Sequence, residues 1–129
     1  MTSEDYLATV KAAIVGNPQI ITWRVLREES PGDAGLYRYR VIWRDGSQLE
    51  MFERFDINDA VCEVTKYSFQ WQDAEANLRK RWDCAAHHIE SMAQPYHVHD
   101  GATGQVLLSQ PMTTALVLAY ISAWLEGSQ

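Results

Sequence analysis

Residues 36–55, LYRYRVIWRDGSQLEMFERF, decide the fold of this chain. In the first half of the stretch, every second side chain is large and apolar: Tyr37, Tyr39, Val41 and Trp43. A period of two is typical of a β-strand with one buried face and one solvent-facing side. Asp45 and Gly46 tolerate the positive φ values of a tight turn, which leads into a second strand over residues 49–55. The stretch therefore predicts an antiparallel hairpin with one buried face.

Further strands are expected on both sides of this hairpin. The expected strands cover residues 20–27, 36–44, 49–55, 63–71 and 78–83, with a short one at 96–99. In the fourth, the side chains expected on one side are Thr65, Tyr67, Phe69 and Trp71. Residues 30–35 and 72–77 are interpreted as loops, and residues 56–59 as a turn or a short helical crossover.

Each end of the chain predicts a helix. The acidic N-terminal segment has a helical stripe of apolar residues at Leu7, Val10 and Ile14. Residues 112–125 lie between Pro111 and Gly127, which are typical of a helix start and a helix end. The predicted fold class is therefore α+β: a single antiparallel sheet of five to six strands flanked by an N-terminal and a C-terminal helix.

Length and composition predict one soluble domain, residues 1–129, with 47% hydrophobic and 22% charged residues. Cys62 and Cys84 are too few for a disulfide framework and are interpreted as reduced thiols, which suits a cytoplasmic protein. The acidic N-terminus does not resemble a signal peptide. The most apolar stretch, residues 115–125, is shorter than the roughly 20 residues that span a bilayer. No membrane association is expected.

The charge pattern allows two interpretations of the arginines on the polar side of the hairpin. A formal net charge of −6 argues against indiscriminate nucleic-acid binding. It does not exclude a local basic face built from a few arginines. Arg38, Arg40 and Arg44 lie opposite the apolar row, either as the ordinary wet face of a half-buried sheet or as an electropositive patch for a polyanion.

All the histidines of the chain fall in one short segment: His87, His88, His97 and His99. On a strand, His97 and His99 project from the same face. In metal-free phosphodiester cleavage, one imidazole accepts the proton of a ribose 2′-hydroxyl and another protonates the leaving oxygen. Alternatively, His97, His99 and either Asp83 or His87 could ligate a divalent metal ion. The spacing matches no standard metal signature, so the metal hypothesis ranks second.

Arginines and aromatic residues near the histidines are the other candidates. Arg81 or Arg79 could stabilise charge on phosphoryl oxygens, and Asp83 could orient a catalytic histidine. The simpler interpretation of Arg81 and Asp83 is an ion pair beside a core tryptophan. We also regard Arg79, Trp71 and Asp73 as candidate substrate-binding residues, although aromatics with a period of two are more often core.

The same segment resembles a known family. Residues 67–73, YSFQWQD, are followed by RWDCAAHH at residues 81–88 and PYHVH at 95–99. This succession resembles the TumE-type toxin family of bacterial and archaeal toxin–antitoxin pairs. The chain departs from the family pattern at Cys84, where Asn is usual, at Ala86, where Pro is usual, and at Tyr96, where a further His is usual. Gln70 stands where a His is frequent.

The resemblance implies a small cytoplasmic protein encoded beside an antitoxin, often a helix-turn-helix DNA-binding protein, that neutralises it by direct contact. The residues themselves predict a nuclease acting on RNA, with His87, His88, His97 and His99 as acids, bases or ligands and with Arg81 and Asp83 in support. The alternative hypothesis is a binding or regulatory protein without catalysis, or a metal-binding module. Alanine at the histidines would abolish the activity of the nuclease and leave that of the binding protein intact.

Overall fold

The computed structural model describes residues 1–84 and 95–127. Ala86, His87 and His88 therefore lie outside the described residues. The elements follow one another as α1 (Ser3–Val15), β1 (Ile20–Glu29), β2 (Ala34–Trp43), β3 (Gln48–Asn58), β4 (Val61–Gln72), β5 (Leu78–Cys84), β6 (Tyr96–Asp100), β7 (Val106–Leu108) and α2 (Thr114–Gly127). The strands form one antiparallel sheet whose spatial order is the order of the chain.

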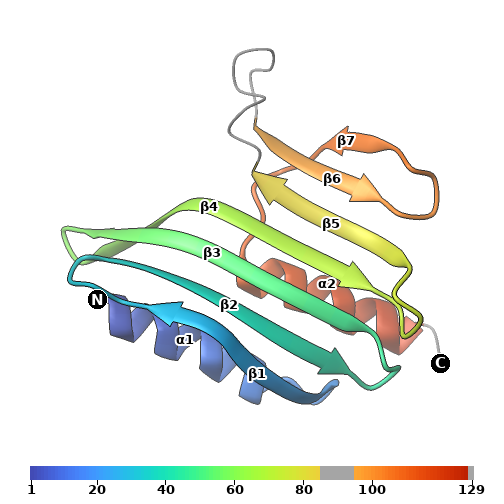
Figure 1. The fold of residues 1–129 in the computed structure, drawn as a ribbon, viewed down its shortest axis with the longest axis horizontal. Coiled ribbons are helices and arrows are strands. Elements are labelled where there is room, and N and C mark those ends of the chain that lie inside the picture. Colours follow the sequence, from blue (N-terminus) through green and yellow to red (C-terminus); the bar gives the residue numbers. More distant parts are fainter. Residues whose placement is uncertain (85–94, 128–129) are drawn as a thin grey trace.

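Both helices lie on the same face of the sheet, so that the other face is open (Figure 1). Leu7, Val10 and Ile14 of α1 are buried, which confirms the predicted apolar stripe. Thr2 caps α1 in a capping box with Asp5. The α+β class and the two flanking helices are confirmed. Among the described residues, no helix is long and apolar enough to cross a membrane.

The antiparallel hairpin predicted for residues 36–55 is present as β2 and β3. Tyr37, Tyr39, Val41 and Trp43 are all fully buried, with 0% exposure. Gly46 has a φ of +84° in the turn between β2 and β3, a backbone conformation that glycine adopts without strain. The loop before β2 is shorter than expected, because β1 extends to Glu29 and β2 already begins at Ala34.

The number of strands was predicted wrongly, because the sheet has seven rather than five to six. The additional strand is β7, which pairs with β6 at the edge of the sheet. It has only three residues and all of them are exposed. A strand that is exposed on both sides has no alternation of apolar and polar residues, so its sequence carries no strand signal.

Two further expectations about β3 and β4 were right only in part. Residues 56–58 continue β3, and the connection to β4 is a turn at Asp59 and Ala60, with φ values of 50° and 62°, rather than a helical crossover. Thr65 is exposed and does not share the buried face of Tyr67. A register shift between Arg54 and Phe55 places an extra residue in β4, and this β-bulge changes which side chains face the core.

A buried carboxylate joins the helices to the sheet. Glu53 of β3 is 1% exposed, and its Oε1 accepts hydrogen bonds from Tyr6 of α1 at 2.7 Å, Tyr37 of β2 at 2.7 Å and Thr114 of α2 at 3.1 Å. Burial raises the pKa of Glu53, although these hydroxyl donors oppose the shift. The sequence contained no signal for this cluster, since its members come from four separate elements.

Candidate functional site

An acidic residue links an arginine and a histidine on the open face of the sheet. Arg81 and Asp83 of β5 lie directly opposite His99 and His97 of β6. Asp83 Oδ2 lies 3.2 Å from Arg81 Nε and 3.2 Å from His99 Nε2. Paired residues on neighbouring strands share a face, so the predicted grouping of Arg81, Asp83, His97 and His99 on one side of the sheet is present.

The members of this cluster differ in their access to solvent. The side chain of Asp83 is only 13% exposed, whereas those of Arg81 and His99 are 44% and 36% exposed. His97 is buried, with 5% exposure. A carboxylate with two charge-assisted or polar contacts can fix the orientation of an imidazole. His99 is therefore the accessible, oriented histidine of the described residues.

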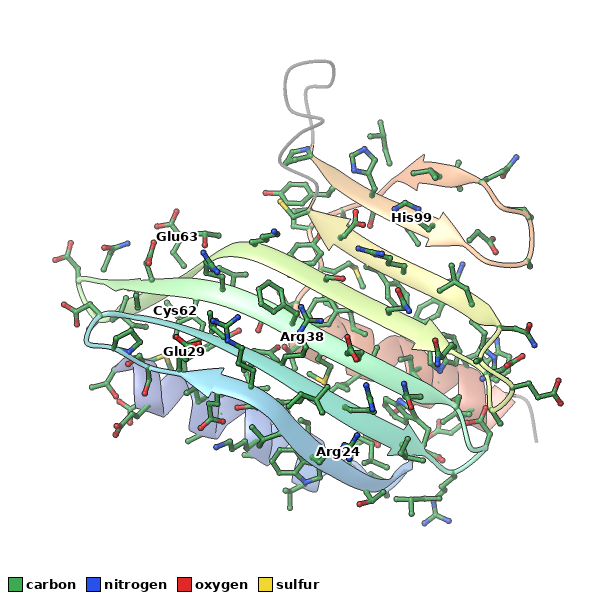
Figure 2. All side chains as sticks on the ribbon, viewed as in Figure 1. Arg24, Glu29, Arg38, Cys62, Glu63 and His99 are labelled. Carbon is green, nitrogen blue, oxygen red and sulfur yellow. The ribbon has the colours of Figure 1, made fainter. Side chains whose placement is uncertain are left out.

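The open face also collects most of the positive charge of the chain. The register of β1 to β5 places seven of the eleven lysines and arginines on it: Arg24, Arg27, Arg38, Arg40, Arg54, Lys66 and Arg81. The carboxylates on the same face are Glu29, Glu50, Asp56, Glu63 and Asp83. Figure 2 shows this face, with Arg24, Arg38 and His99 labelled on strands that span the sheet. An acidic protein thus has one locally basic surface.

A polar hollow of about 280 Å³ lies on this face next to the cluster, and Arg81 belongs to both. Lys66, Ser68 and Gln70 line it from β4, and Arg38 and Glu50 line it from β2 and β3. The predicted alternation of residues 63–71 already placed Lys66 on the side opposite to Tyr67, but no motif in the sequence singled it out as a site residue. Gln70 had been noted only as a departure from the family pattern.

The predicted substrate-binding residues Arg79 and Trp71 lie on the opposite, helix-covered face. A register shift between Trp71 and Gln72 leaves Arg79 as the extra residue of a bulge in β5. The Arg79 guanidinium carbon lies 4.9 Å from the centre of the Trp71 ring and 4.5 Å from that of Trp124 in α2. Arg79 Nη1 also lies 2.7 Å from Asp45 Oδ2. Arg79 and Trp71 are thus together, but they are separated from the histidines by the sheet.

The third predicted substrate-binding residue, Asp73, organises the turn between β4 and β5. Its Oδ1 accepts hydrogen bonds from the backbone N–H groups of Glu75 and Asn77, both at 2.9 Å. The hydrogen bond from the Asn77 backbone is the main cause of the lowered pKa of Asp73, and the Asn77 side chain and the Glu75 backbone lower this pKa further. Its place in this turn explains the presence of the Asp73 carboxylate without a role in substrate binding.

Two of the departures from the family pattern fall on the covered side of the sheet. Tyr96 is opposite Cys84, and both pack against the hydrophobic core. The Tyr96 ring stacks on that of Tyr67 at 6.2 Å. Burial and the Asp83 carboxylate raise the pKa of the Cys84 thiol, which agrees with its interpretation as an unreactive cysteine. Tyr96 and Cys84 therefore lie on the opposite side of the sheet from His97 and His99.

The described part of the chain contains no group of three His, Cys, Asp or Glu side chains placed to hold a metal ion. His97, His99 and Asp83 share a face, but they are not arranged as a three-ligand set. Any site of that kind would need a further ligand such as His87, which lies outside the described residues.

Comparison with known proteins identifies the family. The family model described as Toxin TumE matches residues 10–126, which covers β1 to β7, the second half of α1 from Val10 onward and all of α2 except Gly127. The chain therefore belongs to the TumE toxin family, as the motifs predicted. It is the toxin component of a toxin–antitoxin pair, and membership of the family implies an antitoxin partner. Searches of curated proteins and of solved structures found no significant match.

Proposed function

We propose that this toxin cleaves RNA on the open face of its sheet, with His99, Asp83 and Arg81 at the reacting phosphate. The observation that carries the proposal is the Asp83 carboxylate, 3.2 Å from both Arg81 Nε and His99 Nε2, on the face that holds most of the basic residues. A local basic surface attracts a polyanion even when the net charge of the protein is negative.

The reaction would follow acid–base chemistry on the ribose. One imidazole removes the proton of a 2′-hydroxyl, and the 2′-oxygen forms a bond to phosphorus as the bond from phosphorus to the 5′-oxygen breaks. A second, protonated imidazole donates its proton to that 5′-oxygen. The products are a 2′,3′-cyclic phosphate and a 5′-hydroxyl. Arg81 would stabilise the negative charge on the phosphoryl oxygens.

Asp83 is assigned a positioning role. It holds His99 by the contact at Nε2, which leaves Nδ1 of His99 as the nitrogen available to exchange a proton with the substrate. His97, His87 and His88 are the candidates for the second imidazole. A divalent metal ion held by His97, His99 and Asp83 is the lower-ranked form of the proposal, because these residues do not form a three-ligand set in the described part of the chain.

The proposal includes the surroundings in which the toxin acts. We expect the antitoxin to be a helix-turn-helix protein encoded by a neighbouring gene, and we expect the pair to work in the cytoplasm. The unpaired state of Cys62 and Cys84 in the structure supports a reducing compartment. A gene without such a neighbour would weaken this part of the proposal.

Expression of variants in a growing host separates cleavage from simple binding. Wild-type protein without its antitoxin should arrest growth and produce RNA fragments with 5′-hydroxyl ends. His99→Ala should abolish both effects, whereas Lys11→Gln, a change on α1, should leave both intact. If His99→Ala and the other histidine variants arrest growth as strongly as the wild type, the toxin acts by binding alone.

A further inference from the structure

The polar hollow on the open face contains hydrogen-bond donors that the protein itself does not use. Lys66, Ser68 and Gln70 occupy alternate positions along β4 and therefore point to the same side. Within the described part of the chain, none of these side chains has a hydrogen bond or an ion pair to another residue. An ammonium, a hydroxyl and an amide thus face the hollow without partners.

The charge around the hollow favours an anion. Arg38 lies over the ring of Phe52 at 4.8 Å, and Arg81 closes the side nearest to the histidines. The carboxylate that lines the hollow, Glu50, is neutralised by two guanidinium groups, Arg38 at 2.8 Å and Arg40 at 3.1 Å. Lys66 therefore contributes a positive charge that no carboxylate of the described residues balances.

We infer that this hollow binds a backbone phosphate of RNA next to the one that is cleaved. The inference rests on the proposed function, because it takes the Arg81, Asp83 and His99 cluster as the reacting site. Arg81 lies between the two positions, opposite Gln70 on β4 and His99 on β6. Neighbouring strands are about 4.8 Å apart, so a single strand of RNA that crosses the sheet can place successive phosphates at the hollow and at the cluster.

The larger pocket on the helix-covered side does not have these properties. Its volume is about 390 Å³, and it is lined by Trp71, Arg79, Lys80, Tyr120 and Trp124. Its main cation, Arg79, is already paired with Asp45 and lies against two indole rings, those of Trp71 and Trp124. Lys80 lies 3.8 Å from Asp100. Lys80 of this pocket therefore provides a matched control for Lys66, since it is a lysine on the other face of the sheet that already has a carboxylate partner.

Salt-dependent binding of a short end-labelled single-stranded RNA measures the contact, with fluorescence anisotropy as the readout. All proteins carry His99→Ala, so that the proposed cleavage cannot consume the probe. Each phosphate contact contributes about 0.7 to the slope of log K against log salt for single strands. We expect Lys66→Gln to reduce the slope by about 0.7 and Lys80→Gln to leave it unchanged. A DNA probe of the same sequence should show the same effect of Lys66→Gln, because the contact is made to a phosphate.

The results separate the two proposals. A normal slope for Lys66→Gln, an equal loss for Lys80→Gln, or no binding by the parent protein at low salt would each overturn the phosphate site. If Lys66→Gln reduces the slope but the wild-type protein cleaves no RNA, the phosphate site stands and the proposed cleavage fails.

Discussion

The two faces of the sheet both hold cations beside aromatic rings, but they use them differently. On the covered face, Arg79 lies against the rings of Trp71 and Trp124 and is paired with Asp45. On the open face, Lys66 has no partner among the described residues. A cation whose interactions are satisfied within the fold contributes to stability, whereas an unsatisfied one is available to a ligand. Lys66 thus differs from Arg79 in its contacts and not in its charge, and it remains available to a ligand.

The largest expected effect is on the open face. His99→Ala should reduce the rate of RNA cleavage by about 10²–10⁴-fold, because it removes one partner of the proposed acid–base pair. Its thermal unfolding should remain close to that of the wild type, since the His99 side chain is 36% exposed. Single-turnover cleavage of a labelled RNA and a thermal melt are the measurements. A cleavage rate within a factor of two of the wild type would remove His99 from the reaction.

A smaller effect, on the free energy of unfolding, separates Arg79 from Lys66. Arg79→Gln should lower the free energy of unfolding by about 1 kcal/mol, through loss of the contacts with the indole rings and Asp45. Lys66→Gln should change it by less than about 0.5 kcal/mol, as is usual for an exposed residue without partners. Urea denaturation of both variants checks the difference. Equal destabilisation would show that Lys66 is also a structural cation.

The smallest expected effect concerns pH and the covered face. Burial raises the folded-state pKa of Glu53 above its ordinary value of 4.5. The folded protein therefore holds the proton more tightly than the unfolded chain. The stabilisation that comes from the tighter binding of this proton by Glu53 is complete below about pH 4.5. It is lost as the pH rises through the folded-state pKa of Glu53.

Glu53→Gln has no such ionisation, so the wild type should lose stability relative to this variant as the pH rises above 4.5. Urea denaturation across that pH range measures the difference between the two proteins. Parallel stability curves would mean that Glu53 ionises in the folded protein as easily as in the unfolded chain. His99→Ala, on the open face, provides the comparison for a change that leaves Glu53 in place.

The central hairpin and the helices were predictable because burial on one side leaves a periodic pattern. Residues 36–55 alternate with a period of two, and α1 has a stripe at helical spacing. The edge strand β7 was missed because its side chains are exposed on both faces. The β-bulges in β4 and β5 could not be predicted either, since a single extra residue such as Thr65 or Arg79 leaves no compositional mark.

The candidate site was predictable in part for the same reason. His97 and His99, two residues apart, were expected to share a face, and the register of β5 and β6 places Arg81 and Asp83 beside them. The side of the sheet occupied by Arg79 could not be derived, because it depends on the bulge in β5. Lys66 became a candidate only when the fold showed which donors lack partners.

The most direct test of the account uses one oligonucleotide with a single ribonucleotide in an otherwise deoxyribose strand. The purified toxin should cut it only at that ribonucleotide and leave a 2′,3′-cyclic phosphate and a 5′-hydroxyl, also in the presence of a chelator. The fully deoxyribose strand should stay intact, since it lacks the 2′-hydroxyl that the proposed mechanism requires. Cleavage of the deoxyribose strand, or no cleavage of either strand or of cellular RNA on translating ribosomes, would contradict the account.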